Sequence, residues 1–301
     1  RPMISMTDNS FNVNLSPSFV AKLVEQIQPK ILETFTLPGD WELSGFTFGD
    51  FRSVFITILS ILYAWNIARI YCVEEGIKDF GYNSSIWLQQ KDELKERLIR
   101  YTGLKQQTIS NILKMLTFGE SGVRNPDIAL QPIIDLENNI YAISPFVWLH
   151  SNAERNLCAL INQIDKEKSI YLKLTQEKEN LLREEIEDYL KPLGYEIKHG
   201  KVKGTDVDVA IIDRKSSACL CLELKWFIEP AEIREGYERS QELRKGVNQA
   251  KTIYGLFQEG DKRLISEVLA INNEYDFLVA VGSRNWIGLS DVQDNDAPII
   301  K

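Results

Sequence analysis

The sequence predicts an α/β protein in which a mostly helical N-terminal region precedes a C-terminal domain with a small central sheet. In the C-terminal half, four short runs rich in β-branched and apolar residues are typical of strands. Two helices, the second of them charged, are expected in residues 152–191, and a long helix at about 231–257 separates the third run from the fourth. The predicted order is therefore helix, three strands, helix, strand. The runs are 195–202, 206–212, 218–226 and 275–283.

Residues 1–85 are expected to form a helical region, and their sequence does not indicate a function. The run Ser53–Ala68 carries no charge, yet it is shorter than the ~20 residues that a helix needs to span a bilayer. Residues 51–75 are apolar nearly all round, which is typical of a helix surrounded by other elements. We therefore predict a buried core helix and no membrane partner, with a membrane span as the alternative.

Residues 86–150 contain the pattern of a helix-turn-helix followed by a hairpin. Leu94 and Leu98 have helical spacing, and a tight break follows at Gly103. The next run, KQQTISNILKMLTF, places its apolar residues on one face of a second helix. The run ALQPIIDLENNIYAISP then indicates a hairpin that turns at residues 137–139.

This order of elements resembles a winged-helix module. The second helix of such a module would offer Lys105 and Gln107, among other polar side chains, to base edges or phosphates. Winged helices also serve as protein-packing modules, and that alternative stays open.

The composition limits the chemistry. The formal net charge of -8 repels polyanions on average, so a nucleic-acid partner requires local basic patches or bound cations. The 4 cysteines form no CxxC pair, which favours a reducing compartment, and we predict a cytoplasmic protein. With only 2 histidines, a metal would have to be held by carboxylates, which favour Mg²⁺ or Mn²⁺.

Two neighbouring strands each carry an acid on an otherwise apolar face. In the strand 206–212, two-residue alternation puts Asp208 on one face with apolar side chains. In the strand 218–226, the leucines share one face, and Glu223 and Lys225 project together from the other. A buried carboxylate is costly unless something compensates it, and one divalent cation would compensate both acids.

The helix before the first of these strands adds a third acid. Glu185 falls inside the apolar stripe of this helix. We therefore expect Glu185 to face the sheet, where its carboxylate needs a cation or a hydrogen-bond donor. The stripe consists of Leu182, Ile186, Tyr189 and Leu193.

Asp208 in DVDVAII, followed by Glu223-Leu224-Lys225 in CLCLELKW, resembles the PD-(D/E)xK nuclease superfamily, which has the restriction-endonuclease-like fold. The resemblance covers roughly residues 165–285 and implies an αβββαβ core. It also implies Mg²⁺ (or Mn²⁺) held by Asp208, Glu223 and Glu185. Lys225 would stabilise charge or position the attacking water.

Other positions extend the family pattern or depart from it. Gln249 resembles the glutamine that some members carry on the helix after the site. Tyr254 stands one residue later than the tyrosine of that version, which leaves its role open. The proline that names the superfamily is absent before Asp208, but the three central residues of the motif are intact.

The resemblance implies a Mg²⁺-dependent endonuclease that hydrolyses phosphodiester bonds, with DNA favoured over RNA and with restriction or phage defence as the expected role. Residues 1–85 would be a helical region, 86–150 a winged-helix-like module, and 151–301 the nuclease-like domain with a helical lead-in. The basic residues expected to contact nucleic acid near the site are Lys198, Lys201, Lys203 and Lys245.

Two alternatives remain. One is a catalytically inactive DNA-binding or scaffold protein that keeps a nuclease-like fold, and the other is an RNase on the same fold. Whether the protein forms a homo-oligomer or is a partner subunit of a larger system also stays open.

Overall fold

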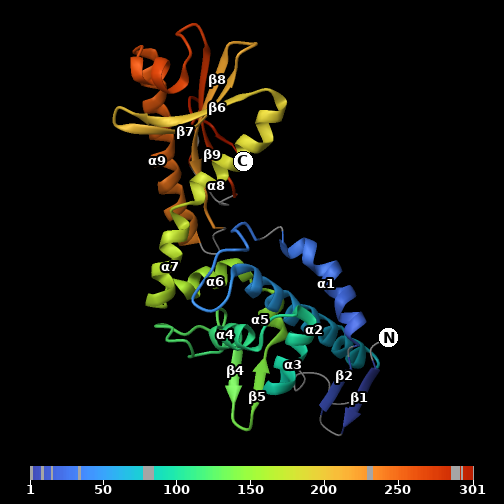
Figure 1. The fold of residues 1–301 in the computed structure, drawn as a ribbon. Coiled ribbons are helices and arrows are strands. Elements are labelled where there is room, and N and C mark those ends of the chain that lie inside the picture. Colours follow the sequence, from blue (N-terminus) through green and yellow to red (C-terminus); the bar gives the residue numbers. More distant parts are fainter. Residues whose placement is uncertain are drawn as a thin grey trace. The chain divides into compact units, whose positions relative to one another are not determined.

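The computed structural model describes residues 3–7, 10–14, 16–32, 35–76, 85–228, 233–285, 292 and 294–300. The chain divides into two compact units, residues 1–173 and 174–301 (Figure 1). The expected segments 1–85 and 86–150 both lie within the first unit, as does the start of the expected segment 151–301. The protein is mixed α/β: helices dominate the first unit, and a mixed sheet forms the centre of the second.

The first unit begins with a hairpin and two helices. Strands β1 (Met3–Thr7) and β2 (Ser10–Asn14) pair antiparallel. Helix α1 (Pro17–Leu32) packs against α2 (Phe48–Glu74). The prediction of a mostly helical region is confirmed by α1 and α2. It missed the hairpin, because five-residue strands contain too few alternations to be distinguished from a loop.

Helix α2 forms the core of the first unit. A capping box closes its N-terminus: the Thr47 hydroxyl accepts from the N–H of Asp50, and the Asp50 carboxylate accepts from the N–H of Thr47. Within the described ranges, α2 is the one helix long and apolar enough to cross a membrane by length and composition. Most side chains from Phe48 to Ala68 are buried in the unit, so the prediction of a core helix is confirmed.

The predicted helix-turn-helix is present as α3 (Lys91–Thr102) and α4 (Gln106–Leu116). Gly103 ends α3 in the left-handed region, at a φ of 71°, and its N–H donates to the carbonyl of Ile99. Glycine adopts this conformation without the steric cost that a Cβ would add. The glycine on which the prediction of a tight turn rested therefore forms that turn.

The predicted hairpin is also present, as β4 (Ile133–Leu136) and β5 (Ile140–Ile143). It turns through Asn138 and Asn139, each with a φ of 63°, a region that asparagine tolerates. Strand β3 (Trp87–Gln90) pairs with β5, which gives the sheet order β3-β5-β4. From α2 to β5 the chain thus has the order helix, strand, helix, helix, hairpin.

Three helices, and not two, occupy residues 152–191, so this expectation is wrong. The breaks between them contain neither glycine nor proline, and the sequence pattern therefore did not mark them. A further short helix, α5 (Pro145–Leu149), precedes them. The three are α6 (Ala153–Ile161), α7 (Asp165–Thr175) and α8 (Lys178–Leu190).

The second unit has the predicted order of helix, three strands, helix, strand. Its five-stranded sheet has the order β10-β9-β8-β7-β6, in which β6, β7 and β8 pair antiparallel and β8, β9 and β10 pair parallel. After α8, the elements are η2 (Lys191–Leu193), β6 (Glu196–Val202), β7 (Thr205–Asp213), β8 (Ala218–Lys225), α9 (Ile233–Gln258), the π-helix η3 (Arg263–Leu269), β9 (Asp276–Ser283) and β10 (Ile299–Ile300).

Different helices cover the two faces of this sheet (Figure 1). On one face, Val247 of α9 and residues of η3 share a core with Ala210 of β7 and Cys221 of β8. On the other face, Leu182 of α8 packs against Leu222 of β8. Helix α8 has no fully buried side chain, so it covers its face less completely than α9 covers the other.

Candidate active site

Glu223 and Lys225 of β8 lie on the face of the sheet that α9 covers, and Asp208 of β7 lies beside them. Glu223 lies on the side of Cys221, whereas the pairing of β6 with β7 shifts register at Asp208, so alternation along β7 does not fix the side of Asp208. Ala210 and Cys221 are paired across β7 and β8 and belong to the core under α9. The prediction that Glu223 and Lys225 project together is confirmed, and Asp208 lies next to them. We call these three residues the acid–lysine cluster.

Two hydrogen bonds fix the side chains of the cluster. The backbone N–H of Leu224 donates to Oδ2 of Asp208 at 2.8 Å, which holds this carboxylate beside β8. Nζ of Lys225 donates to Oε1 of Glu223 at 2.7 Å. The strand backbone and the lysine thus preorganise the two acids next to each other.

Glu223 is a buried carboxylate, and only one of its two oxygens accepts a hydrogen bond within the described ranges. The residue is 2% exposed, and within the described part of the chain its Oε2 has no hydrogen-bond partner. Burial and the charge of Asp208 raise the pKa of Glu223 to about 7, against the effect of the hydrogen bond from Lys225. Near neutral pH, Glu223 therefore exchanges readily between its protonated and ionised forms.

Lys225 and Asp208 are also perturbed. Burial acts to lower the pKa of Lys225, but its hydrogen bond to Glu223 and the negative charges around it outweigh burial, so the pKa lies above its usual value. Burial raises the pKa of Asp208, against the hydrogen bond from Leu224, and the charge of Asp206 raises it further. With both acids ionised, the cluster carries net negative charge that an additional cation would neutralise.

Glu179 is a further acid at the cluster, which the sequence reasoning missed. It lies in the first turn of α8, and its Oε1 is 4.0 Å from Nζ of Lys225. Burial raises its pKa, against the charge of Lys225, and the charges of Asp208 and Asp206 add to the rise. Its position at the start of the helix before the sheet, where acids are favoured, is the signal that could have found it.

Glu185 lies on the sheet side of α8, where it lines a pocket with Leu222 and Leu224. Its side chain is 56% exposed and forms an ion pair with Arg284. The guanidinium of Arg284 also lies 4.2 Å from the centre of the Trp226 ring. Arg284 supplies the hydrogen-bond donor expected for this carboxylate, so a role of Glu185 as a metal ligand beside Asp208 and Glu223 stays a prediction.

Helix α9 presents a glycine to the cluster. Gly246 is so close that an added Cβ would lie 3.3 Å from Cε of Lys225. Gln249 is half-buried one turn further along α9, and its role at the site stays a prediction. The ring of Tyr254 lies 6.4 Å from that of Phe277, centre to centre, so this tyrosine packs on the core.

The basic residues predicted to contact nucleic acid differ in availability. Lys198 forms an ion pair with Glu196 at 3.0 Å. Lys201 and Lys203, in and after β6, and Lys245, next to Gly246 on α9, are exposed. A polyanion that binds Lys198 would compete with Glu196, whereas the exposed side chains of Lys201, Lys203 and Lys245 are accessible to it.

In the first unit, Lys105 and Gln107 are exposed at the start of α4, as a contact surface requires. Nε2 of Gln107 donates to Oδ1 of Asn111 at 2.9 Å, and Nδ2 of Asn111 donates to the carbonyl of Gly45 at 3.3 Å. Internal contacts therefore occupy part of the polar face of α4.

The donor chemistry of the cluster fits a hard divalent cation. Carboxylate oxygens are the ligands that Mg²⁺ and Mn²⁺ prefer, and the partnerless Oε2 of Glu223 supplies one. Over the described ranges, no three His, Cys, Asp or Glu side chains gather closely enough to hold a metal. Asp208 and Glu223 are the two acids of the cluster that could contribute oxygens to such a cation.

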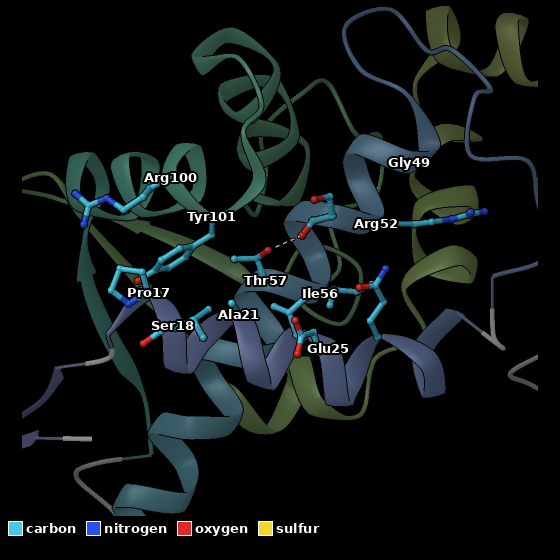
Figure 2. A pocket seen from close by; sticks show the side chains of 14 residues that line it. Pro17, Ser18, Ala21, Glu25, Gly49, Arg52, Ile56, Thr57, Arg100 and Tyr101 are labelled. Carbon is cyan, nitrogen blue, oxygen red and sulfur yellow. Dashed lines mark hydrogen bonds between the residues drawn. The ribbon is translucent and has the colours of Figure 1, made fainter. Parts of the chain in front are cut away.

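A pocket of ≈ 750 Å³ lies in the first unit, between α1, α2 and α3. Figure 2 shows Ser18, Thr57 and Tyr101 in its wall, and the hydroxyl of Thr57 donates to the carbonyl of Ser53 at 2.7 Å. Its lining includes no residue predicted for the active site or for nucleic-acid contact. The acid–lysine cluster therefore remains the candidate active site.

Comparisons with models of protein families, with curated proteins and with solved structures found no match. A functional assignment therefore depends on the residues of this chain and their geometry.

Proposed function

We propose that this protein is a metal-dependent nuclease that hydrolyses phosphodiester bonds at the acid–lysine cluster. The observation that carries the proposal is the buried carboxylate of Glu223, whose Oε2 has no hydrogen-bond partner in the described part of the chain. Leaving such an oxygen unsatisfied costs stability, and this cost is typical of groups that bind an external partner. With Asp208 beside it, the fitting partner is a divalent cation.

The fold of the second unit supports the proposal. The order α8, β6, β7, β8, α9, β9 agrees with the αβββαβ core of the PD-(D/E)xK superfamily, which the motif resembles. Asp208 and Glu223 would hold Mg²⁺ or Mn²⁺, and the bound cation would lower the pKa of a water molecule and neutralise phosphate charge. Lys225 would stabilise the negative charge that develops on the phosphate oxygens or orient the attacking water.

DNA is the proposed substrate, in preference to RNA. The helix, strand, helix, helix, hairpin order from α2 to β5 supports a winged-helix-like module, which would offer Lys105 to a DNA backbone. A chain of net charge -8 needs local positive charge near a polyanion, and Lys201, Lys203 and Lys245 would supply it beside the cluster. Restriction or phage defence in the cytoplasm is the proposed role.

Cleavage of plasmid DNA tests the proposal. Supercoiled plasmid, linear duplex DNA and RNA are incubated with the protein in Mg²⁺, in Mn²⁺ or in EDTA. We expect cleavage of DNA only with metal, and a loss of about 10²–10³-fold in Asp208→Ala and Lys225→Ala, because each removes charge stabilisation at the reacting phosphate. Lys215→Ala is the matched control: Lys215 is an exposed lysine in the turn between β7 and β8, and its removal should change cleavage by less than about twofold.

A second candidate is a catalytically inactive DNA-binding or scaffold protein. It is favoured by one observation: over the described ranges, no group of three acids, cysteines or histidines could hold a metal by itself. Wild-type protein that cleaves none of the polymers in either metal would support this candidate. Metal-dependent cleavage of RNA alone would instead support an RNase on the same fold.

A further inference from the structure

Gly246 lies in the interior of α9, directly over the acid–lysine cluster. A Cβ added to it would lie 3.3 Å from Cε of Lys225, 3.4 Å from Cγ of Glu223 and 3.4 Å from Cγ1 of Val281. The contact with Lys225 is tighter than ordinary van der Waals contact, so Lys225 would have to move by a few tenths of an ångström, whereas the two contacts of 3.4 Å stand at the limit of ordinary contact. The absence of a side chain at this position therefore leaves room for the stem of Lys225 under α9.

The backbone of Gly246 gives no other reason for a glycine. Its conformation is helical, and it does not lie in the positive-φ region that glycine alone adopts freely. In the interior of a helix, glycine is less stable than alanine, since it loses more conformational freedom on folding. Gly255, on the same helix, has no atom within 4 Å of its would-be Cβ, so the constraint is local to Gly246.

We propose that Gly246 is a positioning residue that keeps the amine of Lys225 against the carboxylate of Glu223. The stem of Lys225 and the Cγ of Glu223 both pack under the glycine, and this packing holds Nζ at 2.7 Å from Oε1. The role of Gly246 in cleavage rests on the proposed nuclease function, whereas its role in the geometry of the pair does not.

The neighbours differ in their ability to make room for a methyl group. Val281 is fully buried in β9, so it is confined by the core. Lys225 has 17% of its side chain exposed and ends in a flexible stem. An alanine at position 246 should therefore displace Lys225 first, and the separation of Nζ from Oε1 should increase.

The test compares Gly246→Ala with Gly255→Ala, two identical changes on one helix. We expect Gly246→Ala to reduce kcat for DNA cleavage by about 10–100-fold with little change in KM, because displacement of a supporting contact disturbs the reacting groups more than substrate binding. Gly255→Ala should stay within about twofold of wild type. Both variants should keep the wild-type circular dichroism spectrum.

A spectroscopic measurement tests the geometry without any activity. In metal-free protein, the NMR signals of the Lys225 ammonium and the Glu223 carboxyl carbon should shift in Gly246→Ala and stay unchanged in Gly255→Ala. Val281→Ala removes the Cγ1 that confines the new methyl, so it should partly restore both the signals and kcat when combined with Gly246→Ala.

Unchanged signals in Gly246→Ala, equal effects of the two alanine variants, or no restoration by Val281→Ala would each overturn the positioning role. Wild-type protein that cleaves no nucleic acid, together with shifted signals in Gly246→Ala alone, would refute the nuclease function and leave the positioning role in place.

Discussion

Both units of this protein bury carboxylates, but they satisfy them differently. In the first unit, Glu154 is 2% exposed and accepts hydrogen bonds from the N–H groups of Thr36 and Leu37 and from the Thr36 hydroxyl. In the second unit, Glu223 is also 2% exposed, but within the described ranges only one of its oxygens has a hydrogen-bond partner. The two carboxylates are therefore equally buried, but hydrogen bonds satisfy both oxygens of Glu154 and only one oxygen of Glu223.

This difference indicates that Glu154 has a structural role and that Glu223 binds an external partner. Glu154 and Glu167 tie the segment 36–44 to α6 and α7, and Glu167 accepts from both the N–H and the hydroxyl of Ser44. Their oxygens are used inside the protein, so folding alone explains their presence. The free oxygen of Glu223 has no such explanation, which favours binding of an external cation there.

The largest expected effect comes from making one substitution in both places. Glu154→Gln places an amide N–H₂ against backbone N–H donors, so we expect the free energy of unfolding to fall by about 3 kcal/mol. Glu223→Gln keeps an acceptor for Lys225 and removes a buried charge. The free energy of unfolding of the metal-free protein should therefore change by less than about 1 kcal/mol or increase. Urea unfolding at pH 8 in EDTA measures both.

The comparison fails if Glu223→Gln destabilises the metal-free protein as much as Glu154→Gln does. In that case the carboxylate of Glu223 would be a structural group like Glu154. Cleavage assays add a second contrast: Glu154→Gln molecules that remain folded should keep wild-type activity, and Glu223→Gln molecules should have lost it.

The next effect is a dependence on pH. The pKa of Glu223 is raised from its usual 4.5 to about 7 in the folded protein. Protonation of Glu223 therefore stabilises the folded protein. This stabilisation is fully present below about pH 4.5 and is lost as the pH rises through about 7. A metal must displace this proton, so Mg²⁺ affinity should rise by about tenfold per pH unit below 7 and level off above it.

The rise in melting temperature on adding Mg²⁺, measured between pH 6 and pH 8.5, reports this affinity. Wild-type protein should show a larger rise at the higher pH, and Glu223→Gln should show a small rise that does not change with pH. A wild-type rise that is the same at every pH would contradict the assignment of Glu223 as a ligand.

The sequence predicted the sheet part of the site well, because strand geometry is local. Two-residue alternation places Glu223 and Lys225 on one face once the strand of 218–226 is assigned, and the strand of 206–212 brings Asp208 beside them. The anchoring acids of the first unit could not be predicted, since Glu154 meets Thr36 across 118 residues and no local pattern encodes such a contact.

The helical acid could not be chosen from the sequence for a related reason. An apolar stripe fixes the rotation of a helix only when that stripe is buried, and α8 has no buried side chain. Long-range contacts of α8 therefore determine which acid lies near the cluster. Glu185 pairs with Arg284, whereas Glu179 approaches Lys225.

The smallest expected effect compares these two acids of α8. Their side chains have nearly the same exposure, 54% for Glu179 and 56% for Glu185, so substitution should disturb the fold equally. Because Glu179 lies 4.0 Å from the amine of Lys225, Glu179→Ala should reduce metal-dependent cleavage by about tenfold. Glu185→Ala removes only the exposed pair with Arg284 and should cost less than about twofold. A larger loss in Glu185→Ala than in Glu179→Ala would favour Glu185 as the helical acid of the site and would require α8 to turn toward the cluster when substrate binds.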